Sequence, residues 1–267
     1  MTKRVIHLFR HAQAESNVGK GAAKIRDTVL TPKGVAQATS IPETYQYLNH
    51  PTLILTSPLR RTILTVLHAF HPSFNCKAAE IFSTPLRIIA MPHLQETGEY
   101  PCDTGSCLRF LKSEYGEYIE FPEEYFPCGE WFVKKGTWLA DDPHLQYTRA
   151  EFVKRFISEQ TFSKEIIVVT YLNFSHFLVN RWLHGPGCGS LFNGLENAVG
   201  VPMVLRKGDS PEFGYEMRVD IPIWWRPHKR KLVSDSAIEM VDADPEHDKT
   251  GHKWMDLDRR LFRCTLS

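Results

Sequence analysis

Short apolar runs alternate along the chain with segments of helical periodicity. Several of these runs contain few polar residues, which is typical of strands that are buried on both faces of a parallel sheet. The predicted strands cover 4–9, 53–57, a part of 81–91, 166–170, 199–205 and 215–223, and the last two are expected to be antiparallel partners.

Helices are predicted between these strands. One begins at Pro32, because Thr31 is a favourable N-cap residue and proline suits the first helical position. Others are expected over 60–70, 148–159 and 173–183. This alternation predicts an α/β protein, a three-layer α/β/α sandwich with a mostly parallel sheet.

Two segments depart from the alternation. Residues 97–147 show no sustained period and are rich in aromatic residues, proline and glycine. Residues 226–267 are charged and poorly periodic. We therefore expect a single domain over 1–267, with an insertion at about 97–147 and a C-terminal extension at about 226–267.

Composition narrows the class of protein. The hydrophobic fraction of 42% and the charged fraction of 24% are ordinary for a soluble globular chain. A net charge of +1 does not indicate binding to nucleic acid or to a membrane surface. No apolar stretch approaches the ~20 residues that span a bilayer. The N-terminus runs directly into a strand, which predicts no signal peptide and a cytoplasmic protein.

The six cysteines are scattered without a paired metal-binding spacing. Free thiols in a reducing compartment are the expected state. A disulfide between Cys102 and Cys107 is the less favoured alternative.

Candidate chemistry follows three predicted strands. Arg10 and His11 follow the first strand, Arg60 and Arg61 the second, and Glu96 the third. Taken singly, they are also explained as a strand end, a solvated helix start and a helix cap or salt bridge. The carboxyl ends of parallel strands meet at one edge of a sheet. Together these side chains predict one site. Its arginines would bind an oxyanion through paired N–H donors, its imidazole would be a nucleophile, and its carboxyl would act as general acid.

Ordered motifs give these residues a family resemblance. They are Arg10-His11-Ala12 with Asn17, then Leu30–Ala38, Ser57–Arg61, Leu94–Glu96 and Pro101–Ser106. In this order and spacing the chain resembles the histidine phosphatase superfamily, also called phosphoglycerate-mutase-like, and especially its fungal-type small members. The similarity covers residues 4–200.

The resemblance implies a role for each matched residue. His11 would attack phosphorus and carry a transient phosphohistidine. Arg10, Arg61 and Asn17 would bind the phosphoryl oxygens, and Glu96 would protonate the leaving group. No metal or other cofactor is required in this family. The substrate would be a small molecule that is phosphorylated or otherwise anionic, with no nucleic acid or membrane as partner.

The insertion is expected to act as a lid that determines the substrate, since long loops over a rigid sheet commonly carry specificity. Asp103 and Thr104 either contact polar groups of the substrate or cap a turn. The aromatic side chains either fill a small lid core, which is the simpler interpretation, or line the pocket for an apolar or planar substrate. They are Tyr100, Phe110, Tyr115, Tyr118, Phe121, Tyr125, Phe126, Trp131, Phe132 and Trp138.

One motif departs from the family pattern. Where the family has Thr-His-Gly-Gly, this chain has Thr170-Tyr171-Leu172-Asn173. Tyr171 can donate one neutral hydrogen bond, but its ordinary pKa near 10 excludes a positive charge. The resemblance implies that the family's histidine donates a hydrogen bond to the phosphoryl group. Loss of such a donor typically costs roughly 100- to 1000-fold in rate. Asn173 and His176 are candidate substrate contacts, although His176 is better explained by packing.

Three functions remain open. The first is a phosphomonoesterase of reduced or specialised activity that works through His11. The second is a recruited acid–base enzyme (a dehydratase, isomerase or lyase) of the kind found in secondary metabolism, with His11, Glu96 and Tyr171 moving protons. The third is a non-catalytic scaffold. A scaffold has no chemical need for all five matched residues, which are Arg10, His11, Asn17, Arg61 and Glu96.

Overall fold

The computed structural model describes residues 4–82, 86–126, 130–160, 162–163, 165–179, 196–207 and 215–219. Its centre is a six-stranded sheet in the order β3-β2-β4-β1-β5-β6. The strands are β1 (Arg4–Arg10), β2 (Leu53–Thr56), β3 (Arg87–Ala90), β4 (Glu165–Thr170), β5 (Gly200–Lys207) and β6 (Tyr215–Val219).

The sheet is mostly parallel, as predicted. β1 pairs with β4, β4 with β2 and β2 with β3, all in parallel. β5 runs antiparallel to β1, and β6 runs antiparallel to β5. β1 and β4, which carry candidate site residues, are therefore neighbours in the middle of the sheet, and Arg10 pairs with Thr170.

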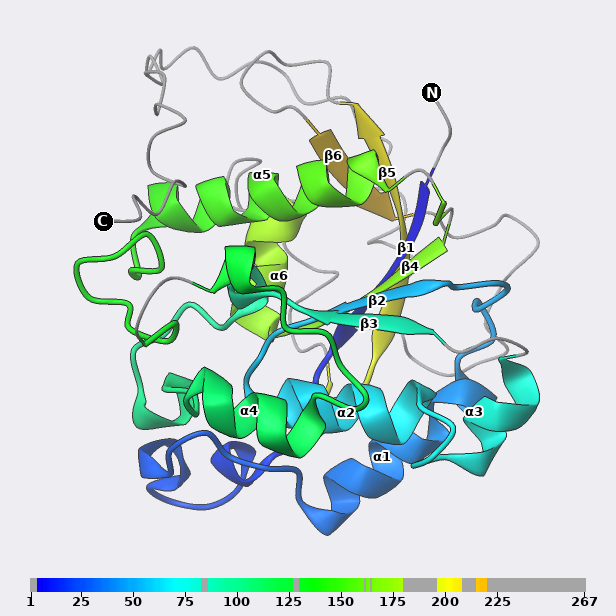
Figure 1. The fold of residues 1–267 in the computed structure, drawn as a ribbon, viewed down its shortest axis with the longest axis horizontal. Helices are drawn as coiled ribbons and strands as arrows, with labels where there is room; N and C mark the ends of the chain where they lie inside the picture. The colour runs from blue at the N-terminus through cyan, green and yellow to red at the C-terminus, as the bar shows by residue number, and fades with distance from the viewer. Residues whose placement is uncertain are drawn as a thin grey trace, which may run out of the picture.

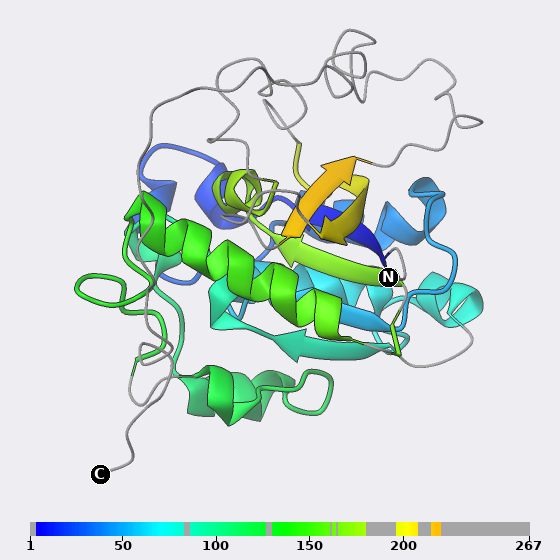
Figure 2. The same cartoon turned by 90° about the horizontal axis from the view of Figure 1, so that it is seen from above.

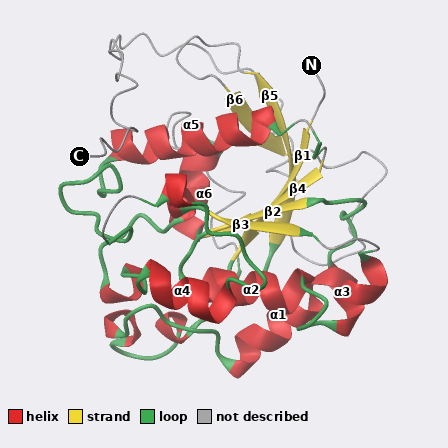
Figure 3. Cartoon of the chain, in the orientation of Figure 1, coloured by secondary structure: helices red, strands yellow, loops and turns green. Residues whose placement is uncertain are grey.

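Helices cover both faces of the sheet (Figures 1 and 3). α1, α2 and α3 lie on one side, and α5 and α6 lie on the other. α4 lies beside the outer edge at β3, where a bridge joins Ile89 to Glu120. The three-layer α/β/α prediction is confirmed, and Figure 2 shows the same layers from above. The α-helices are α1 (Pro32–Thr44), α2 (Arg60–Phe70), α3 (Cys76–Ile81), α4 (Leu108–Tyr115), α5 (Pro143–Glu159) and α6 (Leu172–Leu178).

Alternating residues of the strands fill two cores. Ile166 and Val168 of β4 pack into the core on the α5 and α6 side, whereas Ile167 and Val169 pack into the core on the α1 and α2 side. All four are 0% exposed. Burial on both faces explains why β4 reads as a continuous apolar run.

The loop after β1 is held by the start of α1. Thr31 caps this helix as predicted, since its side chain accepts a hydrogen bond from the Gly34 backbone at 3.0 Å. A Cβ at Gly34 would lie 1.9 Å from the carbonyl oxygen of Gln13. α1 and the loop that carries His11 can approach this closely only because residue 34 has no side chain.

Several predicted boundaries were wrong. α5 begins at Pro143 rather than 148, because Asp142 caps it by accepting from the backbones of His144 and Leu145. α6 begins at Leu172 and ends at Leu178; the expected 180–183 lies outside the described residues. The segment 97–147 also contains a helix, α4, that its lack of periodicity concealed.

Some predictions fall on residues that are not described, including the C-terminal extension at 226–267. Where the structure describes cysteines, Cys76, Cys102 and Cys107 are free thiols. Within the described ranges, no helix combines the length and the apolar character needed to cross a bilayer.

Candidate active site

The carboxyl ends of the parallel strands bring the candidate residues to one edge of the sheet. The backbone N–H of His11, after β1, donates to the carbonyl of Thr170 at the end of β4 at 3.0 Å. The N–H of Met91, after β3, donates to the carbonyl of Thr56 at the end of β2 at 2.8 Å. The edge is thus tied together by main-chain bonds between neighbouring strands.

His11 is buried at this edge and held in one tautomer. Its side chain is 4% exposed, and Nδ1 lies 2.7 Å from the carbonyl oxygen of Ala12. A carbonyl can only accept, so Nδ1 carries the proton and Nε2 carries the lone pair. Burial is the main cause that holds the pKa of His11 well below its ordinary value, and the positive charge of Arg61 is the second cause. His11 is therefore neutral at physiological pH.

Arg61, from the first turn of α2, is held by the lid segment (residues 97–147). It is 3% exposed, and its Nη2 donates to Oδ1 of Asp103 at 2.7 Å while Nη1 donates to the carbonyl of Cys102. Its Nε is buried without a hydrogen-bond partner. Asp103, predicted to contact substrate or cap a turn, instead forms an ion pair with Arg61.

Arg10 and Glu96 complete the charged part of the edge. Burial lowers the pKa of Arg10, and the nearby charge of Glu96 opposes this shift. Burial raises the pKa of the Glu96 carboxyl, although Oε1 accepts a hydrogen bond from the backbone of Thr97 at 2.8 Å. A carboxyl that keeps its proton to higher pH suits a general acid.

Tyr171 lies beside His11, but its hydroxyl is bonded to other protein side chains. Its side chain is 0% exposed, and its hydroxyl donates to Oγ of Ser57 at 2.9 Å and lies 3.3 Å from Oγ1 of Thr62. The ring packs 5.2 Å from the His11 ring and 4.6 Å from the Arg61 guanidinium. Burial raises the pKa of the hydroxyl further. The hydroxyl is thus bonded to Ser57, and donation from Tyr171 to a substrate stays a prediction.

The loop after β1 is bound to a later segment through two asparagines. Oδ1 of Asn17 accepts from the Ala14 backbone at 2.9 Å and from Nδ2 of Asn197 at 3.4 Å. Nδ2 of Asn197 also donates to the carbonyl of His11 at 2.9 Å. These bonds use the oxygen of the Asn17 amide and place the residue close to His11. Sequence reasoning missed Asn197, which no motif singled out.

The remaining candidates are less directly connected to His11. Thr104 donates to the carbonyl of Tyr100 at 3.5 Å, so it closes a turn, which was one of the two alternatives. Asn173 is exposed on the first turn of α6. His176 is buried in the same helix, 6% exposed, in agreement with the packing interpretation.

Two further cations lie near Glu96 and were not predicted. Lys134, in the lid segment, is 4% exposed and donates to the carbonyl of Gly98. Burial lowers the pKa of Lys134 to about 8, while Asp103 and Glu96 oppose the shift. Arg149, inside α5, is 1% exposed. Neither residue follows a strand or belongs to a recognisable motif, so only the tertiary structure brings them together.

Four aromatic residues of the lid segment join the core on the α1 and α2 side of the sheet and do not form a separate lid core. Phe121, Phe126, Trp131 and Phe132 are buried. The indole of Trp131 donates to the carbonyl of Ser106 at 2.9 Å. This core anchors the part of the lid that presents Asp103 and Lys134 to the site.

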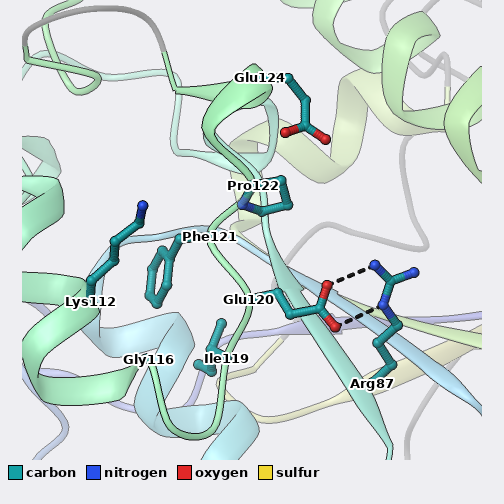
Figure 4. A pocket seen from close by; sticks show the side chains of 8 residues that line it. All are labelled: Arg87, Lys112, Gly116, Ile119, Glu120, Phe121, Pro122 and Glu124. Atoms are coloured by element: carbon teal, nitrogen blue, oxygen red, sulfur yellow. Dashed lines mark hydrogen bonds and ion pairs between the residues drawn. The ribbon is translucent and has the colours of Figure 1, made fainter.

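A separate groove of about 590 Å³ lies at the outer edge of the sheet (Figure 4). Its charged walls are paired with neighbours, since Arg87 bonds to Glu120 at 2.7 and 2.8 Å and Lys112 bonds to Glu123 at 2.8 Å. None of the candidate site residues lines it. The lining residues are Arg87, Lys112, Gly116, Ile119, Glu120, Phe121, Pro122 and Glu124.

Fold and site together define an α/β protein with the phosphoglycerate-mutase-like fold and a buried histidine on which the charges of two arginines act. Residues 6–82 match the family model described as "Histidine phosphatase superfamily (branch 1)". This match covers less than a third of the chain, and it makes that part of the chain similar to the histidine phosphatase superfamily. The resemblance seen in the motifs is confirmed at this level, and membership of a fungal-type group stays a prediction.

Two similar proteins illustrate the relationship. A probable phosphatase of Schizosaccharomyces pombe is 27% identical over 172 residues, which are 63% of this chain and 74% of that protein. The crystal structure of phosphoglycerate mutase from Bacillus anthracis is 18% identical, with a TM-score of 0.50, and covers 90% of this chain and 96% of that chain. The second likeness concerns the fold alone. Over the described part of this chain, no group of three or more histidine, cysteine or acidic residues is arranged to hold a metal ion.

Proposed function

We propose that the protein is a phosphomonoesterase of reduced or specialised activity, which acts on a small phosphorylated substrate through a phosphohistidine at His11. The observation that carries this proposal is the buried imidazole whose Nδ1 lies 2.7 Å from the carbonyl of Ala12. This contact leaves Nε2 as a neutral nucleophile, within reach of the charges of Arg61 and Arg10. The similarity to a probable phosphatase of Schizosaccharomyces pombe supports the same reaction.

In the first step, Nε2 of His11 attacks phosphorus and an N–P bond forms while the bond to the leaving oxygen breaks. The imidazole becomes positively charged, and its Nδ1–H remains bonded to the carbonyl of Ala12, which stabilises that charge. Glu96 transfers its proton to the leaving oxygen, so the organic product departs as an alcohol. The raised pKa of Glu96 keeps this proton available.

In the second step, the Glu96 carboxylate takes a proton from water as the water oxygen attacks phosphorus. The N–P bond breaks, inorganic phosphate leaves, and His11 returns to its neutral form. The proton that Glu96 lost is restored in the same step. Arg10 and Arg61 balance the charge on the phosphoryl oxygens throughout, which is the main electrostatic requirement of phosphoryl transfer.

The proposed activity is reduced because Tyr171 stands where the family pattern has a histidine, and a tyrosine cannot donate a positively charged hydrogen bond. The hydroxyl of Tyr171 bonds to Ser57 at 2.9 Å, so it contributes nothing to the phosphoryl group unless that bond breaks. The same contact weighs against the acid–base alternative, in which Tyr171 would exchange protons with substrate. A scaffold is disfavoured because Arg149 is buried with Nε and Nη1 unbonded, which is costly and serves no purpose without a ligand.

The proposal is tested by hydrolysis of p-nitrophenyl phosphate. The wild-type protein should turn over this ester, His11→Ala should abolish turnover, and both should keep the same melting temperature. His50→Ala is the matched control, because His50 is exposed and bonds through its backbone N–H. No turnover by the wild type, or equal turnover by His11→Ala, would contradict the proposal.

Tyr171→His tests the cause of the reduced rate. A histidine restores an imidazole beside His11 and should raise kcat by as much as about 100-fold. If kcat does not rise, this one substitution does not explain the reduced activity.

A further inference from the structure

Arg149 is a buried arginine, and two of its three guanidinium nitrogens have no hydrogen-bond partner within the protein. Its guanidinium is 1% exposed. Nη2 donates to the carbonyl of Gln95 at 3.1 Å and to Oε1 of Gln146, whereas Nε and Nη1 are buried without a hydrogen-bond partner. Three of the five N–H groups of an arginine belong to those two nitrogens. No carboxylate forms an ion pair with Arg149 among the residues that the structure describes.

This state is unusual for a structural residue. Buried charges are normally paired, and buried polar groups normally bonded, because both otherwise lose their hydration without replacement. An apolar side chain of the same size would pack in α5 at lower cost. An arginine with three unused donors therefore indicates an anion that this chain does not provide.

The position of Arg149 assigns that anion to the proposed active site. Arg61 reaches the edge of the sheet from α2 and lies over the ring of Tyr171 at 4.6 Å. Arg149 reaches it from α5, in the opposite layer, and lies over the ring of Phe174 at 4.4 Å. The charge of Glu96 acts on both guanidinium groups, and Arg149 is bonded to Gln95, the residue next to Glu96.

We propose that Arg149 binds the anionic group of the substrate and compensates in part for the charged hydrogen-bond donor that Tyr171 does not supply. The ligand is an oxyanion, and Nε and Nη1 would donate to its oxygens. Arg149 is 1% exposed, so the anion would reach it from inside the site. The inference rests on the proposed phosphomonoesterase function.

Titration with inorganic phosphate, followed by calorimetry, tests this role. Arg149→Met removes the charge and the donors, and should weaken phosphate binding by at least about tenfold, the loss expected of one charged hydrogen bond. Its melting temperature without phosphate should be equal to or higher than that of the wild type. Arg149→Lys keeps the charge and should bind with intermediate affinity. Arg155→Met is the matched control, since Arg155 lies on the same helix and is exposed.

The outcomes separate the two proposals. If the wild type binds phosphate and Arg149→Met binds it equally well, Arg149 is structural and the inference fails while the phosphatase proposal stands. If the wild type binds no phosphate, the proposed function itself fails. If Arg149→Met does not fold, Arg149→Lys decides: wild-type affinity and an unchanged KM for p-nitrophenyl phosphate would overturn the inference.

Discussion

Burial acts in the same direction on the two titratable groups of the proposed reaction, His11 and Glu96. It disfavours the charged form of each, so the pKa of His11 is lowered well below its ordinary value and the pKa of Glu96 is raised. The imidazole thus keeps its lone pair while the carboxyl keeps its proton. One environment prepares both a nucleophile and an acid.

This pairing predicts the pH dependence of the reaction. For an alkyl phosphate, kcat/KM should fall about tenfold per pH unit above the raised pKa of Glu96, because the ionised carboxylate has no proton to give. Glu96→Gln should lower kcat/KM by about 100- to 10,000-fold and remove this dependence. An aryl phosphate needs little acid assistance and serves as the control. An equal loss for both esters would contradict the role of Glu96 as acid.

Tyr171 is predicted to stabilise the fold rather than take part in the reaction. Tyr171→Phe removes the hydroxyl that bonds to Ser57 at 2.9 Å, and should lower the free energy of unfolding by about 1 kcal/mol. Turnover of p-nitrophenyl phosphate should be unchanged. Urea denaturation and steady-state kinetics on the same preparation measure both quantities. A fall in kcat without a loss of stability would show that the hydroxyl acts on substrate.

At the scale of elements, α1 supports the loop that carries His11. Gly34→Ala would ordinarily stabilise a helix by about 1 kcal/mol. Here the new Cβ would lie 1.9 Å from the carbonyl of Gln13, so the helix or the loop must move. We expect a lower melting temperature and a lower kcat. Lys33→Ala, at an exposed neighbour in α1, should change neither; a stabilised Gly34→Ala protein would show that the contact is not tight.

Elements with local signals were predictable. The Thr31-Pro32 pair located the start of α1, and the apolar runs located β1, β2 and β4. Asp142-Pro143 is a signal of the same kind, and it would have located the start of α5. α4 was missed because its apolar stripe of Leu108, Leu111 and Tyr115 spans only eight residues, within a segment that shows no sustained period.

At the scale of the molecule, the positions of the site residues that follow strands were predictable from the sequence. The contacts that residues of the lid segment and of α5 make with this site were not. His11, Arg61 and Glu96 follow from the meeting of parallel strand ends at one edge. Asp103 was a candidate, but its ion pair with Arg61 was not foreseen, and neither Lys134 of the lid segment nor Arg149 inside α5 was a candidate. Their contacts with the site depend on how distant segments pack, which no local pattern records.

The most direct test of the central claim is detection of phosphohistidine at His11. Protein that is quenched in alkaline denaturant during turnover of p-nitrophenyl phosphate would be digested and examined by mass spectrometry. The proposed mechanism predicts one phosphoryl group on the peptide that contains His11, and none in His11→Ala. Turnover without a phosphoryl group on His11, or with the group on another residue, would contradict it.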